Sequence, residues 1–284
     1  MIQYLYLGRI SYEDGLRLQA ELAELRYQDR IVNTLVLLEH PAVLTLGRNA
    51  DRSNVLASDE LLAARGITLH QINRGGDVTY HGPGQLVGYP IFDLRSLRNQ
   101  SGTRMGPVDF VRMMEEALIR VCGVFGVPAG RVAGLTGVWC GGEVLDKNGG
   151  SERKIGAIGI HVSRGITSHG FAYNVTTNLN DFKLINPCGI TDKPVTSLEL
   201  ERARRFREAE SLPGLESIAH EAARQFGQVF GEQVLALESV EALRKLAEEA
   251  AAKQFPAEDT PLQVPVDVER LKHGPDGLER PIRA

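Results

Sequence analysis

The alternation of apolar and polar positions in the first fifty residues predicts strands on either side of a helix. The stretches QYLYLG (3–8) and NTLVLLEHPAVLTLG (33–47) are short, rich in Leu and Val, and bounded by turn residues, a pattern typical of strands. Between them, SYEDGLRLQAELAELRYQ (11–28) places leucines at helical spacing. Ser11 precedes acidic residues of the first turn, so we expect it to cap this helix.

A second helix and a group of strands are predicted in the middle of the chain. Residues 107–126 are amphipathic, with Pro107 near the start and glycines toward the end. The segments 136–145 and 154–175 are predicted to form hairpins, the second with a short turn at Ser163 to Gly165. Strands flanked by helices, without a strict βαβ repeat, indicate an α+β or mixed α/β fold with mixed sheets.

The composition changes near residue 212. We expect a main domain over residues 1–212 and a C-terminal helical extension with a Pro-rich tail over 213–284, packed on the same domain. Within this extension, 215–231 and 238–255 have the pattern of surface helices. The last residues are charged and rich in proline, which favours a loose tail.

Charge, hydropathy and cysteine content restrict the class of protein. The 284 residues are 43% hydrophobic with a net charge of −4, which disfavours a chain whose main task is to coat nucleic acid. The first residues lack the features of a signal peptide, and no apolar run is long enough for a membrane span. The cysteines, Cys122, Cys140 and Cys188, are odd in number and widely spaced, so a reducing cytoplasm is expected.

One of these cysteines has the local sequence of a reactive thiol. Cys188 lies in INPCGI, between Pro187 and Gly189, and this setting predicts an exposed turn instead of a strand or helix interior. A nearby cation would favour the reactive thiolate, and Lys154, which opens the apolar run KIGAIGIHV, is a candidate for that charge. Cys122 has the sequence context of a buried apolar residue. The context of Cys140 does not decide between a buried and a reactive thiol.

The segment NRGGDVTYHGPGQLVGYP (73–90) contains more glycine and proline than a simple turn requires. It lacks the patterns of a P-loop and of a dinucleotide fold. Closely spaced glycines let a backbone approach a ligand, Arg74 is able to hold a carboxylate or phosphate, and His81 is able to donate a hydrogen bond or carry a proton. For His81 alone, a structural role as a core-facing histidine of a connecting loop is favoured over a catalytic one, and structural hydrogen bonding is favoured for His161 and His169.

The strings RGGDVTYHGPGQ, KIGAIGIHV, SHGFAYNV and INPCGI, in this order and at these separations, closely resemble the lipoyl(octanoyl) transferases of protein lipoylation. The resemblance implies a biotin/lipoate protein ligase-like fold, with residues 1–212 as the octanoyltransferase catalytic domain. By position, the family's acyl-thioester nucleophile falls on Cys188, and the lysine that favours its thiolate falls on Lys154. The family's substrate-lining segments fall on Arg74, Gly75, Gly76, Asp77, Val78, Thr79, Tyr80 and His81, on Ala157, Ile158 and Gly159, and on Gly170, Phe171 and Ala172.

The same resemblance implies the partners. The donor is octanoyl-acyl carrier protein, and the acceptors are lipoyl domains of 2-oxoacid dehydrogenases and the H protein of glycine cleavage. No cofactor, neither ATP nor a metal, is needed with a thioester donor. Basic residues near the site, Arg48, Arg52 and Arg74, are candidates for docking acidic partners. The insert 146–152 and the C-terminal extension depart from the family pattern.

Three other functions remain open from the sequence. An ATP-dependent lipoate-protein ligase would have the same fold without a nucleophilic thiol. A cysteine hydrolase with Cys188 and His81 would release free fatty acid. A noncatalytic protein would bind acyl carrier or lipoyl domains without transferring the acyl group.

Overall fold

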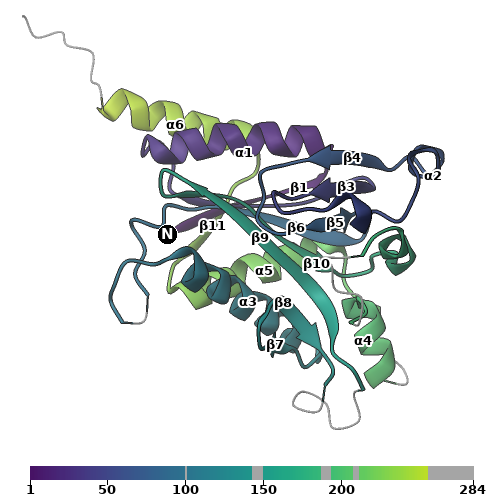
Figure 1. Ribbon diagram of the computed structural model, residues 1–284. Coiled ribbons are helices and arrows are strands. Elements are labelled where there is room, and N and C mark those ends of the chain that lie inside the picture. Colours follow the sequence, from purple (N-terminus) through teal and green to yellow (C-terminus); the bar gives the residue numbers. More distant parts are fainter. Residues whose placement is uncertain (100, 143–149, 187–192, 207–210, 255–284) are drawn as a thin grey trace, which may run out of the picture.

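A computed structural model describes residues 1–99, 101–142, 150–186, 193–206 and 211–254 (Figure 1). Its strands are β1 (Ile2–Arg9), β2 (Asn33–Glu39), β3 (Val43–Leu46), β4 (Thr68–Gln71), β5 (Val78–His81), β6 (Gln85–Ile91), β7 (Gly130–Val132), β8 (Leu135–Cys140), β9 (Arg153–Ser163), β10 (Ile166–Asn174) and β11 (Val234–Ala236). Its helices are α1 (Tyr12–Tyr27), α2 (Asp59–Ala64), α3 (Pro107–Val124), α4 (Leu198–Arg205), α5 (Leu215–Phe230) and α6 (Val240–Gln254), with short 3-10 turns η1 (Arg52–Asn54) and η2 (Leu179–Leu184).

The central element is an eight-stranded sheet in the order β11-β1-β2-β6-β10-β9-β8-β7. β1 is parallel to both β11 and β2, whereas the other neighbours are antiparallel. The sheet is therefore mixed, as predicted. The predicted hairpin of 154–175 is confirmed as β9 and β10, which are joined through Arg164 and Gly165, both at positive φ. The second arm predicted for 136–145 begins at residue 143, outside the described residues.

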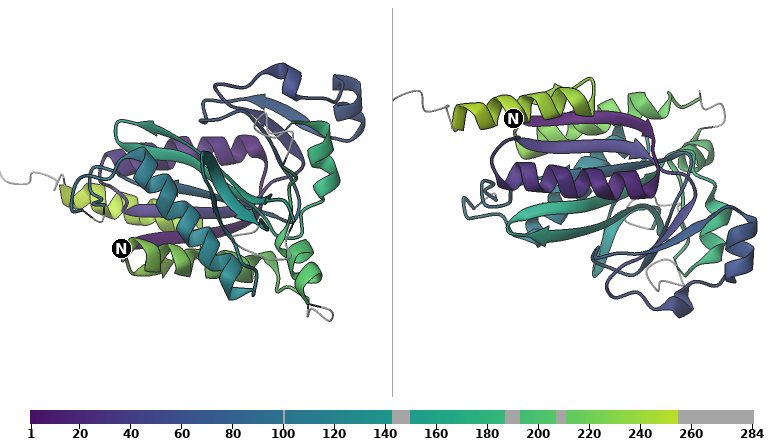
Figure 2. Two further views of the ribbon diagram at one scale, coloured as in Figure 1. Left: turned by 60° about the horizontal axis from the view of Figure 1, so that its bottom comes forward. Right: turned by 90° about the horizontal axis from the view of Figure 1, so that it is seen from above.

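Helices cover both faces of this sheet (Figure 2). Leu35 and Leu37 of β2 pack with α3 and α5, and Val36 and Leu38 pack with α1 and α6. This alternation explains why every residue of β2 is buried, because a strand covered on both faces has no polar side. The predicted cap of α1 is confirmed, since Ser11 Oγ accepts a hydrogen bond from the Asp14 N–H at 3.0 Å.

The helix α5 is part of the main core. Its apolar side, which includes Ile218, Ala222 and Phe226, is fully buried against α3 and the sheet. β11 then adds a parallel strand beside β1. The surface helix predicted over 215–231 is confirmed as α5, whose opposite side, with Glu216, His220 and Arg224, is exposed. Residues 255–284, predicted as a loose tail, lie outside the described residues.

A second, three-stranded sheet in the order β4-β3-β5 lies at one end of the large sheet (Figure 1). It has its own apolar core, which includes Leu44, Val78 and Tyr80 together with Phe182 and Leu184 of η2. Val55 and Ile185 form a bridge, and Asn186 N–H donates to the Asn54 carbonyl at 2.7 Å. The small sheet is thus joined to the segment that leads to residue 187.

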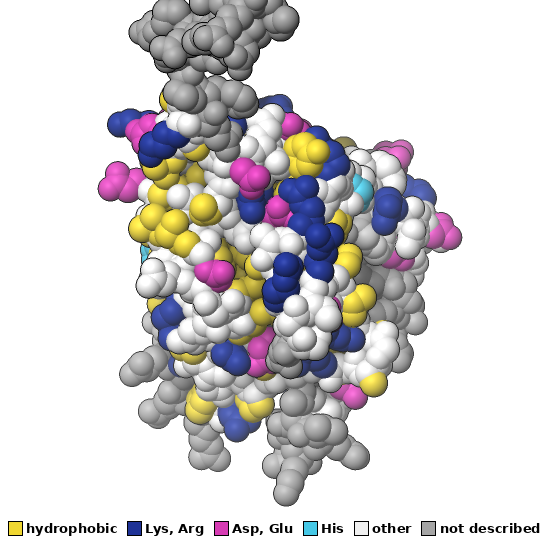
Figure 3. All heavy atoms as spheres, turned by 90° about the vertical axis from the view of Figure 1, so that its left-hand side faces the viewer, with side chains coloured by type: hydrophobic (Ala, Val, Ile, Leu, Met, Phe, Trp, Pro, Cys, Tyr) yellow, Lys and Arg dark blue, Asp and Glu magenta, His cyan; other side chains and the backbone are white. Residues whose placement is uncertain are grey.

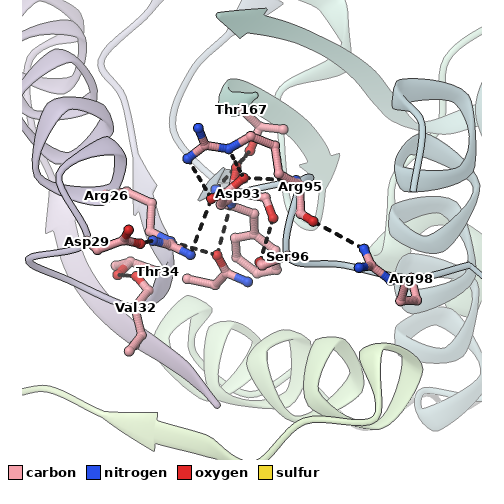
Figure 4. Close-up of polar contacts among 11 residues, drawn as sticks. Arg26, Asp29, Val32, Thr34, Asp93, Arg95, Ser96, Arg98 and Thr167 are labelled. Atoms are coloured by element: carbon pink, nitrogen blue, oxygen red, sulfur yellow. Dashed lines mark hydrogen bonds and ion pairs between the residues drawn. The ribbon is translucent and has the colours of Figure 1, made fainter. Parts of the chain in front are cut away.

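A buried carboxylate fixes the far end of the large sheet (Figure 4). Asp93 follows β6 and accepts hydrogen bonds from Arg95 at 2.8 and 2.9 Å, and it pairs with Arg26 of α1 at 3.7 Å. Asn33 Oδ1 receives the backbone N–H of Asp93 at 2.9 Å and Nε of Arg26 at 3.0 Å. The end of α1 is in this way locked to β2 and to the residues after β6.

Candidate functional site

An apolar pocket of about 510 Å³, including its open mouth, lies where β9 and β10 meet the small sheet. Its lining residues come from four parts of the chain: Tyr12 of α1; Arg74, Gly76, Thr79 and His81; Val87 and Tyr89 of β6; and Ala157, Ile158, Gly159, His169, Gly170, Phe171 and Ala172 of the β9–β10 hairpin.

The pocket takes alternate residues from β5. Thr79 and His81 line it, whereas Val78 and Tyr80 belong to the core of the small sheet. Tyr80 Oη donates to Asp181 at 3.0 Å on that opposite side. Side chains along a strand alternate between its faces, so a continuous predicted segment from 74 to 81 was too broad. Val78 and Tyr80 support the sheet and do not line the pocket.

The glycine-rich loop presses mainly against the protein's own backbone. A Cβ on Gly159 would lie 2.7 Å from the Gly75 carbonyl oxygen, which no real side chain tolerates. The Gly75 N–H also donates to the Ile160 carbonyl at 3.2 Å. Asp77 accepts from Asn54 Nδ2 at 2.6 Å. Gly75 and Asp77 therefore hold the loop in place, and Gly76 is the loop glycine that reaches the pocket.

Arg74 lines the pocket, and its guanidinium also stabilises the loop. Its Nη1 donates to the Gly75 carbonyl at 2.8 Å, and its Nη2 donates to the Asp77 carbonyl at 2.6 Å. Hydrogen bonds from a cation to backbone oxygens fix both the loop and the charge. The half-buried Arg74 is thus a poor candidate for docking a protein partner.

Aromatic residues that the sequence did not single out form the inner wall of the pocket. Tyr12 stacks on His81 with ring centroids 6.0 Å apart, and it also contacts His40 edge-on at 5.1 Å. His40 Nδ1 bonds to the Ile10 carbonyl at 2.9 Å, so its Nε2 accepts from Tyr89 Oη at 2.6 Å. Tyr12 is the first residue of α1, and no sequence pattern places it beside residues 81 and 89.

The histidines around the pocket are neutral at physiological pH. Burial, with a smaller effect from His40, lowers the pKa of His81 to about 3. Burial and then the Arg74 charge lower the pKa of His169 to about 4. His81 Nδ1 bonds to Gln85 Oε1 at 2.8 Å, and His169 Nε2 bonds to Asn73 Oδ1 at 2.7 Å. These two rings therefore add no charge to the pocket wall. His169 makes the structural hydrogen bond that the sequence favoured, and it also lines the pocket.

We expect these neutral histidines to make the fold sensitive to mild acid. Unfolding exposes rings with a pKa near 6.5, so the unfolded state binds more protons below that pH. The free energy of unfolding should therefore decrease by about 1.4 kcal/mol per pH unit for each ring as the pH falls from 6.5 to 5. Urea unfolding at several pH values measures this slope. His81→Asn removes one of the rings, so it should reduce the slope by about 1.4 kcal/mol per pH unit.

The exposed His220 provides the control for that measurement. His220→Asn should leave the slope between pH 6.5 and 5 as it is in the natural protein. Equal slopes in the His81 and His220 variants would contradict the burial argument.

A second, smaller cavity of about 300 Å³ contains Lys154. It shares Thr79, Ala157 and Ala172 with the apolar pocket, so the two spaces adjoin across these side chains. The remaining lining residues are Gln85, Asn174, Phe182 and Val195. The described chain on both sides of residues 187–192, at Phe182 and Val195, thus reaches the cavity that holds Lys154.

Backbone pairing fixes Lys154 near the start of β9. Its N–H donates to the Pro194 carbonyl at 2.9 Å, and its carbonyl accepts from the Thr196 N–H at 2.9 Å. The side chain is buried, with Nζ 4.7 Å from the ring centroid of Trp139. Arg153, its neighbour, makes two bonds of 2.8 and 2.9 Å to the buried Glu201. These contacts tie β9 to the chain segment that follows residue 192.

Two of the three cysteines lie in the interior of the protein. Cys122 and Cys140 are both buried, and Cys122 Sγ lies 3.1 Å from Tyr173 Oη. A hydrogen bond with Cys122, together with burial, strongly raises the pKa of Cys140. A thiol of raised pKa is a poor nucleophile, so Cys140 is not a candidate, and Cys122 is excluded by its full burial. Cys188 lies outside the described residues.

Basic side chains gather on a face away from Lys154. Figure 3 shows a band of Lys and Arg on the face that carries the β9–β10 turn. Arg164 of this turn and Arg95 both lie over the Tyr27 ring, whereas Lys154 is at the other end of β9. Arg48 and Arg52 are exposed on the small sheet side, and Arg52 pairs with Asp59 at 2.6 Å. Within the described ranges, no helix has the length and apolar character to span a membrane.

Comparison with known proteins agrees with this geometry. Residues 11–211 match the family model described as the lipoyl protein ligase A/B catalytic domain. An octanoyltransferase of Acidobacterium capsulatum is 62% identical over 243 residues, which cover 84% of this chain and 94% of that protein. The chain belongs to the octanoyltransferases of this family. A second octanoyltransferase, of Koribacter versatilis, is 51% identical and covers 89% of this chain and 94% of its own.

Solved structures support the fold. A bipartite lipoate protein ligase of Thermoplasma acidophilum, studied with its E2 lipoyl domain, superposes with a TM-score of 0.60 at 18% identity. It covers 90% of this chain and 94% of its own. A lipoate-protein ligase A bound with ATP gives the same TM-score and identity and covers 88% of this chain and 94% of its own. The predicted lipoate ligase-like α/β fold is therefore confirmed.

Proposed function

We propose that the protein transfers an octanoyl group from acyl carrier protein to a lysine of a lipoyl domain, through a thioester on Cys188. The observation that carries this proposal is the apolar pocket that adjoins the Lys154 cavity across Thr79, Ala157 and Ala172. An acyl chain in the pocket would bring its carbonyl end toward Lys154. Membership in the octanoyltransferases supports the same assignment.

The pocket suits an uncharged aliphatic chain. Val87, Ile158 and Phe171 provide apolar surface, and burial of each methylene contributes about 0.8 kcal/mol. The rings of His81 and His169 are neutral because burial lowers their pKa values. The charged Arg74 guanidinium in the lining donates hydrogen bonds to the Gly75 and Asp77 carbonyls. The other lining side chains offer the acyl chain no charge that retains water, which limits hydrolysis of the acyl-enzyme.

The first chemical step is thioester exchange. The Cys188 thiolate attacks the carbonyl carbon of the donor, a new C–S bond forms, and the C–S bond to the carrier's pantetheine breaks. Lys154, as an ammonium, stabilises the attacking thiolate and supplies a proton to the departing sulfur. One thioester replaces another, so the step is close to thermoneutral, and neither ATP nor a metal ion is needed to activate the acyl group.

The second step forms the amide. The amine of the acceptor lysine attacks the thioester carbon, a C–N bond forms, and the C–S bond to Cys188 breaks. The amine loses a proton to Lys154 or to water, and the thiolate is restored for another cycle. Amide formation from a thioester is downhill, so this step drives the whole transfer.

The partners follow from the two steps. The donor is octanoyl-acyl carrier protein, and the acceptors are lipoyl domains of 2-oxoacid dehydrogenases and the glycine cleavage H protein. One structural relative was studied with its own E2 lipoyl domain. The free thiols of Cys122 and Cys140 are compatible with action in the cytoplasm, where thiols stay reduced.

Filling the apolar pocket away from the Lys154 cavity should shorten the acyl chain that the enzyme accepts. Val87→Phe adds four carbon atoms to a residue that lines the apolar pocket but not the Lys154 cavity. Loss of room for about four methylenes corresponds to about 3 kcal/mol, or on the order of 100-fold in octanoyl transfer. Kinetics with butyryl, hexanoyl and octanoyl carrier protein measure the profile, in which butyryl transfer should stay within about threefold.

Ser163→Leu, at the exposed end of β9, is the matched control and should leave the chain-length profile as it is. A uniform loss for all chain lengths in the Val87 variant would place the acyl chain elsewhere.

The proposed function is tested by reconstitution. Purified protein is incubated with octanoyl carrier protein and a lipoyl domain, and mass spectrometry follows the octanoyl amide on the domain. We expect transfer without ATP. Transfer only from free octanoate with ATP would identify a ligase instead, and rapid release of octanoate without an acceptor would identify a hydrolase. Binding of both proteins without transfer would identify a noncatalytic function.

A further inference from the structure

Trp139 is the single tryptophan of the chain, and it contacts Lys154 directly. Its side chain is fully buried, and the ammonium of Lys154 lies over the indole ring, 4.7 Å from the ring centroid. A cation within about 6 Å of an aromatic face is attracted by the negative charge of the π system. This contact fixes one side of the Lys154 ammonium.

A break in strand pairing brings the two residues together. Along β8 and β9, Val138 pairs with Gly156, but the next residue, Trp139, pairs with Lys154 and not with Ile155. Ile155 is the extra residue of a bulge, and its side chain enters the main core. In a regular ladder, Trp139 would lie opposite Ile155. The bulge therefore places the indole opposite Lys154.

The strand that carries Trp139 is held by a buried carboxylate. Glu115 of α3 is fully buried and accepts the Gly137 N–H at 3.0 Å. Arg112 and Arg131 pair with this carboxylate at 2.7 and 2.9 Å. Gly137 has a φ of +127°, and a Cβ there would lie 2.6 Å from the Gly156 carbonyl oxygen and 3.4 Å from Lys154 Cε. The short approach to the Gly156 carbonyl and the positive φ leave room only for glycine at position 137.

We propose that Trp139 is a positioning residue for Lys154 in acyl transfer, acting through the face of its indole ring. This inference rests on the proposed function. The indole Nε1 is buried and has no hydrogen-bond partner among the described residues, whereas buried tryptophans usually use this group. The ring face, and not the N–H, makes the contact with Lys154. A phenylalanine should therefore replace Trp139, and an aliphatic residue should not.

The enzymatic test compares Trp139→Phe with Trp139→Leu. With the reconstituted transfer assay, Leu should lower kcat about tenfold to thirtyfold with KM changed less than about twofold, because the ammonium loses its π support. Phe should keep kcat within about threefold of the natural protein. Phe92→Leu, a buried aromatic packed on Phe110 and Phe230, is the control for a loss of packing alone and should leave kcat unchanged.

Thermal unfolding of all variants accompanies these measurements. Equal kcat values for the Phe and Leu variants, or a kcat loss in Phe92→Leu as large as that in Trp139→Leu, would overturn the proposal. Those results would show that Trp139 acts only by filling the core.

A second measurement does not depend on activity. Because Trp139 is the only tryptophan, the emission spectrum of the natural protein reports its surroundings alone. Lys154→Met should shift that emission, and Lys183→Met, at an exposed lysine of η2, should not. An unchanged spectrum in Lys154→Met refutes the contact. If Lys154→Met shifts the emission but the natural protein transfers no octanoyl group, the contact is confirmed. The proposed function is then refuted, and with it the role of Trp139 in transfer.

Discussion

A Cys188→Ala variant should form no detectable octanoyl amide on a lipoyl domain. In the proposed mechanism this sulfur carries the acyl group between two proteins, and loss of a nucleophile in covalent catalysis costs on the order of 10⁴-fold or more. The reconstituted assay with octanoyl carrier protein measures the effect. The variant should unfold at the same urea concentration as the natural protein.

Cys140→Ala and Cys122→Ala are the matched controls for that variant. Both thiols are buried, and a hydrogen bond with Cys122 together with burial raises the pKa of Cys140. Their loss should change transfer by less than about threefold, apart from any effect of a small cavity on stability. Transfer that persists in Cys188→Ala and disappears in Cys140→Ala would move the nucleophile to the buried pair.

A Lys154→Met variant should transfer octanoyl groups on the order of 10² to 10⁴ times more slowly. Methionine keeps most of the aliphatic length but removes the ammonium that, in the proposed mechanism, stabilises the thiolate and moves the proton. Lys154→Arg keeps the positive charge, but a planar guanidinium is larger than an ammonium and does not fit equally between Trp139 and Val195. We expect an intermediate rate for it.

Single-turnover kinetics check the Lys154 prediction, because they separate acylation of Cys188 from amide formation. Lys183→Met controls for the loss of a lysine near residue 187, since Lys183 is exposed and donates to Asn180 at 2.9 Å. A Lys154→Met rate within about threefold of the natural one would remove Lys154 from the mechanism.

The sequence predicts the elements of this fold better than their assembly. The apolar run of β2, the Ser11 cap and the turn after Ser163 depend on neighbours in the chain, and each is confirmed. The separation of β2 from β3 into different sheets depends on contacts with β5 and β6 instead. Only His40 and two more residues lie between the two strands, and no local pattern marks the change of sheet.

The residues of the pocket, too, are only partly predictable from the sequence. Its predicted residues lie on three recognisable segments, and ten of the fourteen substrate-lining predictions face the pocket. Strand alternation removes Val78 and Tyr80, which belong to the small core. Tyr12 and Tyr89 join the wall because α1 and β6 pack beside β10. The register break that pairs Trp139 with Lys154 likewise arises from packing of Ile155 in the core.

Together, these features describe a site in which a largely apolar pocket adjoins the cavity that Lys154 lines. The backbone contacts of Lys154 with Pro194 and Thr196 join it to the chain that follows residue 192, and Trp139 fixes its ammonium from the other side. In the proposed function, the donor thioester provides the free energy for acyl transfer, so no activated nucleotide is required.

The most direct test locates the acyl group on the protein. The natural protein is incubated with octanoyl carrier protein in the absence of a lipoyl domain, acidified, digested with trypsin and analysed by tandem mass spectrometry. The cysteines fall in separate tryptic peptides, 121–131, 132–147 and 184–202. We predict an octanoyl thioester on the peptide 184–202, at Cys188. An octanoyl group on either of the other peptides, or full transfer activity without any acylated peptide, would contradict the account.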